Sequence, residues 1–165
     1  MLLVEDGTLG EDRWRHLEDD EAVPEDPAIT VSLARWLKTR DTLRTHNGKL
    51  GLRLPNNAAP EEIAPDLDRL DLIVLNFPKF TDGRAYSQAR LLRDRFGYKG
   101  ELRATGDVLR DQLLFMRRCG FNSFVVGERA VAEEWGKAFG EVDVFYQKAA
   151  DGTPWVMRQR LGKPN

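Results

Sequence analysis

Short apolar runs recur along the chain at intervals typical of an alternating β/α protein. Residues 72–75 (Leu-Ile-Val-Leu) are apolar at every position, which is typical of a central parallel strand covered on both faces. Residues 50–54 alternate and predict a second strand. Further strands are expected at 102–105, 124–127 and 142–147, and a returning hairpin at 155–157.

Between these strands, apolar residues recur at the spacing that is typical of helices. Leu33, Trp36 and Leu37 predict a helix capped by Ser32 or Thr30. The other expected helices are a short one from Pro60 that Pro65 interrupts, one at 85–96 ended by Gly97, one at 108–119 capped by Gly106-Asp107 and ended by Gly120, and one at 131–139. The resulting rhythm favours a mainly parallel sheet.

Length decides between the parallel architectures. A complete TIM barrel needs roughly 200 to 250 residues, and this chain has 165. We therefore expect an α/β fold built as a partial, half TIM-barrel-like sheet, with an open doubly wound sheet as the alternative. A half-barrel leaves sheet edges to be covered, which predicts a homodimer or a complex, or an intramolecular cover by either end of the chain.

Charge divides the chain into two parts. Residues 1–27 carry ten acidic side chains and two arginines, whereas residues 28–165 carry 17 acidic and 23 basic side chains. We interpret 1–27 as an acidic N-terminal arm and 28–165 as a single α/β domain. Within the arm, residues 13–17 could form an edge strand with Trp14 buried, or the whole arm could be solvated.

Composition excludes several function classes. The net charge of −2 argues against a non-specific nucleic-acid binder, and no apolar run approaches the roughly 20 residues of a membrane span. The first residues lack the pattern of a secretory signal, so we expect a cytoplasmic protein. Cys119 is the single cysteine, and no metal-binding, flavin or nucleotide motif is present, which leaves the cofactor unknown.

Charged residues follow two neighbouring strands. Lys79, Asp82 and Arg84 come after 72–75, and Arg103 and Asp107 lie at or just after 102–105. Ligands of parallel sheets bind at the carboxyl ends of the strands, so Lys79, Arg84 and Arg103 are candidate anion-binding residues. Asp82 and Asp107 would orient them or transfer a proton; alternatively, both aspartates only cap helices and pair with the arginines. Catalytic residues are not identified.

Four segments resemble one family: 76–84 (NFPKFTDGR), 86–93 (YSQARLLR), 100–108 (GELRATGDV) and 118–121 (RCGF). They resemble an uncharacterised bacterial family of unknown function whose members are described as oxidoreductases involved in sulfite reduction, and whose genes lie beside that of the sulfite reductase haemoprotein. The resemblance implies a role in sulfur assimilation and implies that haemoprotein as a partner. It supplies no catalytic residues.

Two hypotheses follow. In the first, the protein is an accessory or small partner protein of assimilatory sulfite reduction that acts with the haemoprotein. In the second, it is a stand-alone barrel-like enzyme, a lyase or isomerase, that acts on a small anionic substrate through Lys79, Arg84 and Arg103. Whether the protein is an enzyme is therefore open at this point.

Overall fold

The computed structural model describes residues 2–5, 8–25, 28–126, 149–150, 152 and 155–156. Within them, one sheet has the strand order β2-β1-β8-β7-β6-β5-β4-β3. The strands are β1 (Leu2–Glu5), β2 (Thr8–Glu11), β3 (Arg15–His16), β4 (Ala28–Ser32), β5 (Lys49–Leu54), β6 (Leu72–Phe77), β7 (Glu101–Gly106) and β8 (Ser123–Val126).

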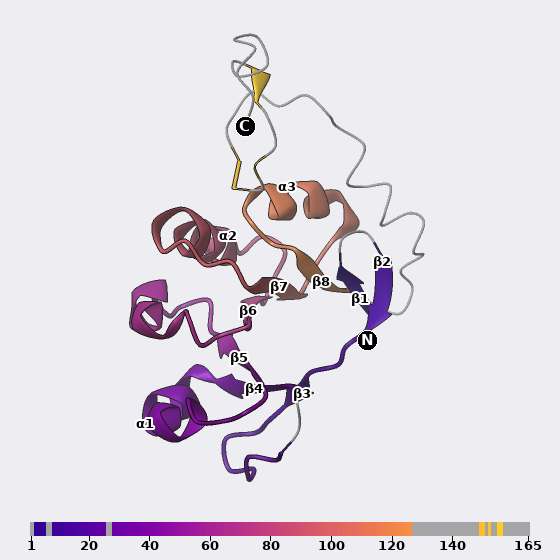
Figure 1. Cartoon of the computed structure of the whole chain (residues 1–165). Coiled ribbons are helices and arrows are strands. Elements are labelled where there is room, and N and C mark those ends of the chain that lie inside the picture. The colour runs from indigo at the N-terminus through magenta and orange to yellow at the C-terminus, as the bar shows by residue number, and fades with distance from the viewer. Residues whose placement is uncertain are drawn as a thin grey trace.

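Strands β3 to β8 run parallel and lie side by side in chain order. A doubly wound sheet would reverse its strand order at a switch point, and this sheet does not. It curls into a half-barrel, and the main helices lie on its outer, convex side (Figure 1). The half-barrel prediction is confirmed, and the doubly wound alternative is wrong.

The helical elements connect consecutive strands. They are α1 (Leu33–Leu43), the 3₁₀ turns Pro60–Glu62 and Ala64–Asp66, α2 (Arg84–Arg90) continued by a π turn at Leu91–Arg95, and the 3₁₀ turn Arg110–Gln112 leading into α3 (Leu113–Arg118). Where the short helix was expected to be interrupted at Pro65, the structure has two consecutive 3₁₀ turns, and Pro65 lies in the second. The expected helix 131–139 and strand 142–147 lie outside the described residues, and only Trp155 and Val156 of the expected hairpin lie inside them.

Alternation along the strands separates two faces. Ile73, Leu75 and Phe77 of β6 join the hydrophobic core beneath the helices, with Leu102 and Ala104 of β7. The intervening positions face the concave side and are more polar. They include Thr30, Arg53, Val74, Arg103 and Ser123. The core therefore sits on the convex side, and a polar layer lines the hollow.

The helix ends follow their sequence signals in most places. The Ser32 hydroxyl accepts a hydrogen bond from the Arg35 N–H (3.0 Å), so Ser32 is the N-cap of α1. Gly97 and Gly120 have positive φ angles of 66° and 108° where their helices stop. The predicted cap at Asp107 is wrong, because α3 begins only at Leu113.

The acidic segment forms part of the sheet. Strands β1 and β2 make an antiparallel hairpin, and β1 also pairs with β8. Of the edge strand predicted at 13–17, Arg15–His16 form β3, which pairs with β4, whereas Trp14 precedes this strand and is half-buried instead of buried. The N-terminal segment is thus an intramolecular cover for the half-barrel, since the chain between β2 and β3 crosses its open side (Figure 1).

Candidate functional site

The carboxyl ends of β6 and β7 are joined by hydrogen bonds between the loops that follow them. The Phe80 N–H donates to Oδ2 of Asp107 (2.9 Å), and the side-chain amide of Gln112 donates to the Phe80 carbonyl (3.2 Å). Asp107 therefore connects two loops instead of capping a helix. These contacts hold the loop that carries Lys79 against the turn before α3.

Asp82 and Arg84 form a bidentate ion pair at this edge. Arg84 Nε lies 3.0 Å from Oδ1 of Asp82, and Nη2 lies 2.7 Å from Oδ2. The Asn56 side chain donates to the same carboxylate (2.8 Å). The hydrogen bond from Arg84 is the largest cause that lowers the pKa of Asp82 to about 2. Asp82 is therefore an orienting carboxylate that stays ionised at neutral pH and a poor proton donor.

Arg103 does not join Lys79 and Arg84. It occupies the middle of β7, in register with Val74, and points to the concave face. Its side chain is 1% exposed and is paired with Glu101 (2.8 Å) and Asp12 (2.8 Å). The expected grouping of three cations is therefore wrong. Arg103 lies three residues before the end of β7, at a position whose side chain faces the concave side of the sheet. Anion binding by Lys79 and Arg84 stays a prediction.

Three exposed apolar side chains lie on the segments that follow the carboxyl ends of β6 and β7. Phe80, Leu109 and Phe115 are 49%, 37% and 56% exposed, and we call them the apolar edge patch. Phe80 is tied to the α3 turn through Gln112, and the Phe115 ring lies 4.9 Å from that of Tyr86. The exposure of Phe115 has a signal in the sequence, because Phe115 lies outside the buried stripe of α3, which contains Leu113 and Met116.

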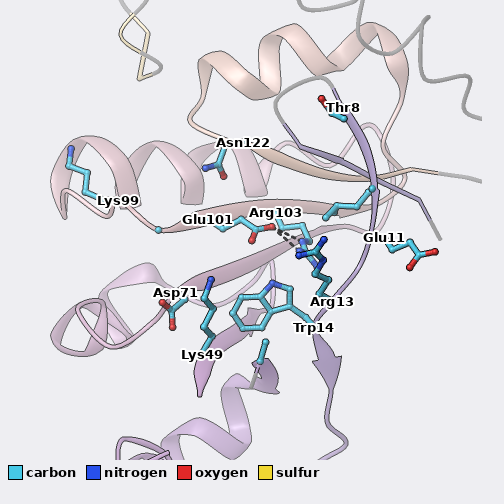
Figure 2. A pocket seen from close by; sticks show the side chains of 14 residues that line it. Thr8, Glu11, Arg13, Trp14, Lys49, Asp71, Lys99, Glu101, Arg103 and Asn122 are labelled. Atoms are coloured by element: carbon cyan, nitrogen blue, oxygen red, sulfur yellow. Dashed lines mark hydrogen bonds and ion pairs between the residues drawn. The ribbon is translucent and has the colours of Figure 1, made fainter. Parts of the chain in front are cut away.

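A cleft of about 1180 Å³ lies at the opposite, amino-terminal edge of the parallel strands. The N-terminal segment and the starts of several strands enclose it (Figure 2). Its lining includes Arg13, Trp14, Lys49, Asp71, Glu101 and Arg103. We call it the amino-edge cleft. Sequence reasoning missed it, because six of its fourteen lining residues come from the segment interpreted as an arm.

Asp12 anchors the N-terminal segment beside this cleft. Its carboxylate accepts from Arg103, from the Trp14 N–H (3.0 Å) and from the His16 ring, whose Nε2 lies 2.9 Å away. Burial alone would raise the pKa of Asp12, but these hydrogen bonds outweigh burial and hold the pKa well below its usual range. The segment is thus fastened by a charged network rather than by apolar contacts alone.

Metal-ligating residues are scattered in the part of the chain that the structure describes. No three His, Cys, Asp or Glu side chains there lie close enough together to hold an ion. Cys119 is buried in the core beneath α3. Nor does any described helix have the length and apolar character needed to cross a membrane.

The fold and its two edges define an α/β half-barrel protein whose open side is crossed by its own N-terminal segment. Residues 51–156, more than half of the chain, match the sequence profile of the family described as "Bacterial protein of unknown function (DUF934)". The chain belongs to this family. A search of curated proteins finds no match.

Proposed function

We propose that this protein is an accessory partner of assimilatory sulfite reduction that works in the cytoplasm and docks on the sulfite reductase haemoprotein. Two lines of support carry the proposal. The sequence resembles a family associated with sulfite reduction, and the structure presents an exposed apolar edge patch of Phe80, Leu109 and Phe115. The patch is the observation on which the docking mode depends.

The patch has the properties of a protein-binding surface. Aromatic side chains are enriched among the residues that dominate binding energy at interfaces, and exposed apolar groups gain from being removed from water. The hydrogen bonds that connect Phe80 to Asp107 and Gln112 fix the loop before a partner arrives. A preorganised surface loses less conformational entropy on binding.

The stand-alone enzyme has weaker support. Arg84 is already neutralised by Asp82, and Arg103 is neutralised by Glu101 and Asp12 on the concave face. Asp82, with a pKa of about 2, holds no proton to donate at neutral pH. Of the three cations expected to bind an anionic substrate, Lys79 alone has no ion pair within the described residues.

Binding of the purified haemoprotein to immobilised protein, measured by biolayer interferometry, tests the proposal. We expect the double variant Phe80→Ser/Phe115→Ser to bind at least about 30-fold more weakly, the effect of losing one strong interface residue. Leu37→Ser is the matched control, because Leu37 is 46% exposed on α1, away from this edge. Equal loss in both variants, or no binding by the wild type, would contradict the proposal.

A further inference from the structure

We propose that the amino-edge cleft binds a nucleoside monophosphate or a ligand of the same chemistry, a flat aromatic ring that carries a phosphate. The inference goes beyond the proposed function, because this cleft lies at the opposite edge of the sheet from the apolar edge patch. Three observations carry it: how Trp14 is seated, which cations flank it, and which partners the nearby carboxylates have.

Trp14 is seated on the backbone of β5. A Cβ atom added at Gly51 would lie 3.2 Å from Cζ3 of Trp14 and 2.8 Å from Cγ2 of Thr30, so the glycine makes room for the indole. The ring is half-buried, and from the cleft it is seen face-on (Figure 2). One side of the indole is thus held by the sheet while part of its π surface remains available for stacking.

Two cations flank the indole. Arg13 precedes Trp14 in the chain, and Lys49 lies two residues before Gly51 on β5, on the same face of the strand. Figure 2 shows the Lys49 ammonium and the Arg13 guanidinium on either side of the ring. In the part of the chain that the structure describes, neither side chain has an ion pair. Both remain available for a ligand phosphate.

The carboxylates nearest these cations already have partners. Oδ2 of Asp71 accepts from the Leu50 N–H (3.0 Å), and Glu101 is paired with Arg103 (2.8 Å). Glu11 points away from Trp14 (Figure 2). Asp71 and Glu101 keep their negative charges, but the lining as a whole carries four cationic and three acidic side chains, a net charge of +1, and the two cations beside the indole have no ion pair among the described residues.

An aromatic surface between two cations suits a ligand with both a ring and an acid. A base gains binding energy when it stacks on an aromatic side chain, and hydrogen bonds from Arg or Lys to phosphate are among the strongest in proteins. Small-molecule sites typically have volumes of about 300–1,000 Å³. At about 1180 Å³ the cleft is large enough for a mononucleotide.

Isothermal titration calorimetry with the purified full chain tests this inference, using adenosine monophosphate and flavin mononucleotide as probes. Adenosine, riboflavin and inorganic phosphate are the comparison ligands. We expect at least one of the two phosphorylated probes to bind, and to bind about tenfold or more tightly than its uncharged nucleoside or than phosphate alone. Binding by neither probe, or equal binding of the charged and uncharged forms, would overturn the inference.

Variants locate the site. We expect Arg13→Gln and Lys49→Gln each to weaken binding about fivefold or more, while Lys38→Gln, an exposed lysine on α1, leaves it unchanged. Both test residues are exposed, so the variants should keep the wild-type melting temperature. If they fold normally and bind the probe as tightly as the wild type, the cleft is not the site. The haemoprotein is absent from this experiment, so the result is independent of the proposed docking.

Discussion

The ion pair between Asp12 and Arg103 should fasten the N-terminal segment to the half-barrel, and Asp12→Asn tests this directly. Asparagine keeps the shape of the side chain and one acceptor oxygen but removes the charge. Arg103 is then left 1% exposed with Glu101 as its remaining ion-pair partner among the described residues.

The structure sets the size of the effect. Breaking a fully buried ion pair by removing one partner costs about 3–5 kcal/mol. The Asp12 side chain is 22% exposed and Arg103 retains Glu101, which reduces the loss. We therefore expect Asp12→Asn to lower the free energy of unfolding by about 2 kcal/mol at neutral pH.

The pH dependence follows from the lowered pKa of Asp12. Because this pKa is lower in the folded than in the unfolded chain, its stabilising effect is present above the unfolded value of about 3.9 and is lost as the pH falls toward the folded value. The stability difference between wild type and Asp12→Asn should therefore shrink below about pH 4.

Urea unfolding followed by tryptophan fluorescence measures this difference across the pH range. Asp20→Asn is the control, because Asp20 is an exposed aspartate in the same segment. The reasoning is refuted if the difference at about pH 3 equals that at neutral pH, or if Asp20→Asn destabilises the protein equally.

Three further predictions concern packing and ionisation. Gly51→Val should cost about 2–3 kcal/mol of unfolding free energy in urea, because the new Cβ would lie 2.8 Å from Thr30; unchanged stability would contradict the close approach. Trp36→Phe should cost about 2 kcal/mol by the same assay, since the indole N–H donates to the buried Asp66 carboxylate (2.9 Å), and a loss below about 0.5 kcal/mol would speak against this bond. Burial raises the pKa of Tyr86 to about 12, so near-ultraviolet absorbance titrations of wild type and Tyr86→Phe should coincide below about pH 11, and an earlier divergence would show that the phenol is solvated.

Much of the parallel sheet could be predicted from sequence because its signals are local. The apolar run at 72–75 lies within β6, and strands 50–54 and 102–105 differ from β5 and β7 by a residue or two at their ends. Helices cover one face of each of these strands, so the apolar positions that meet the helices recur within a few residues of one another. Strand β4 was missed because its five residues run directly into α1 and were treated as the approach to that helix.

The features that were missed depend on contacts between distant parts of the chain. Leu3 of β1 pairs with Val125 of β8, a partner that no local pattern reveals. Arginine is a residue type that commonly binds anions, but the guanidinium of Arg103 is already paired with Asp12, which lies 91 positions away in the chain. The amino-edge cleft was missed for the same reason, since Trp14 lies against Gly51, a residue far along the chain, and no local pattern reveals this contact.

Size-exclusion chromatography with light scattering, on the protein alone and mixed with the sulfite reductase haemoprotein, tests the central claim most directly. The account predicts a stoichiometric complex with a mass equal to the sum of its components. It also predicts that Phe80→Ser/Phe115→Ser abolishes the complex while Leu37→Ser preserves it. Separate elution of the two proteins, or a complex that persists in the double variant, would contradict the account.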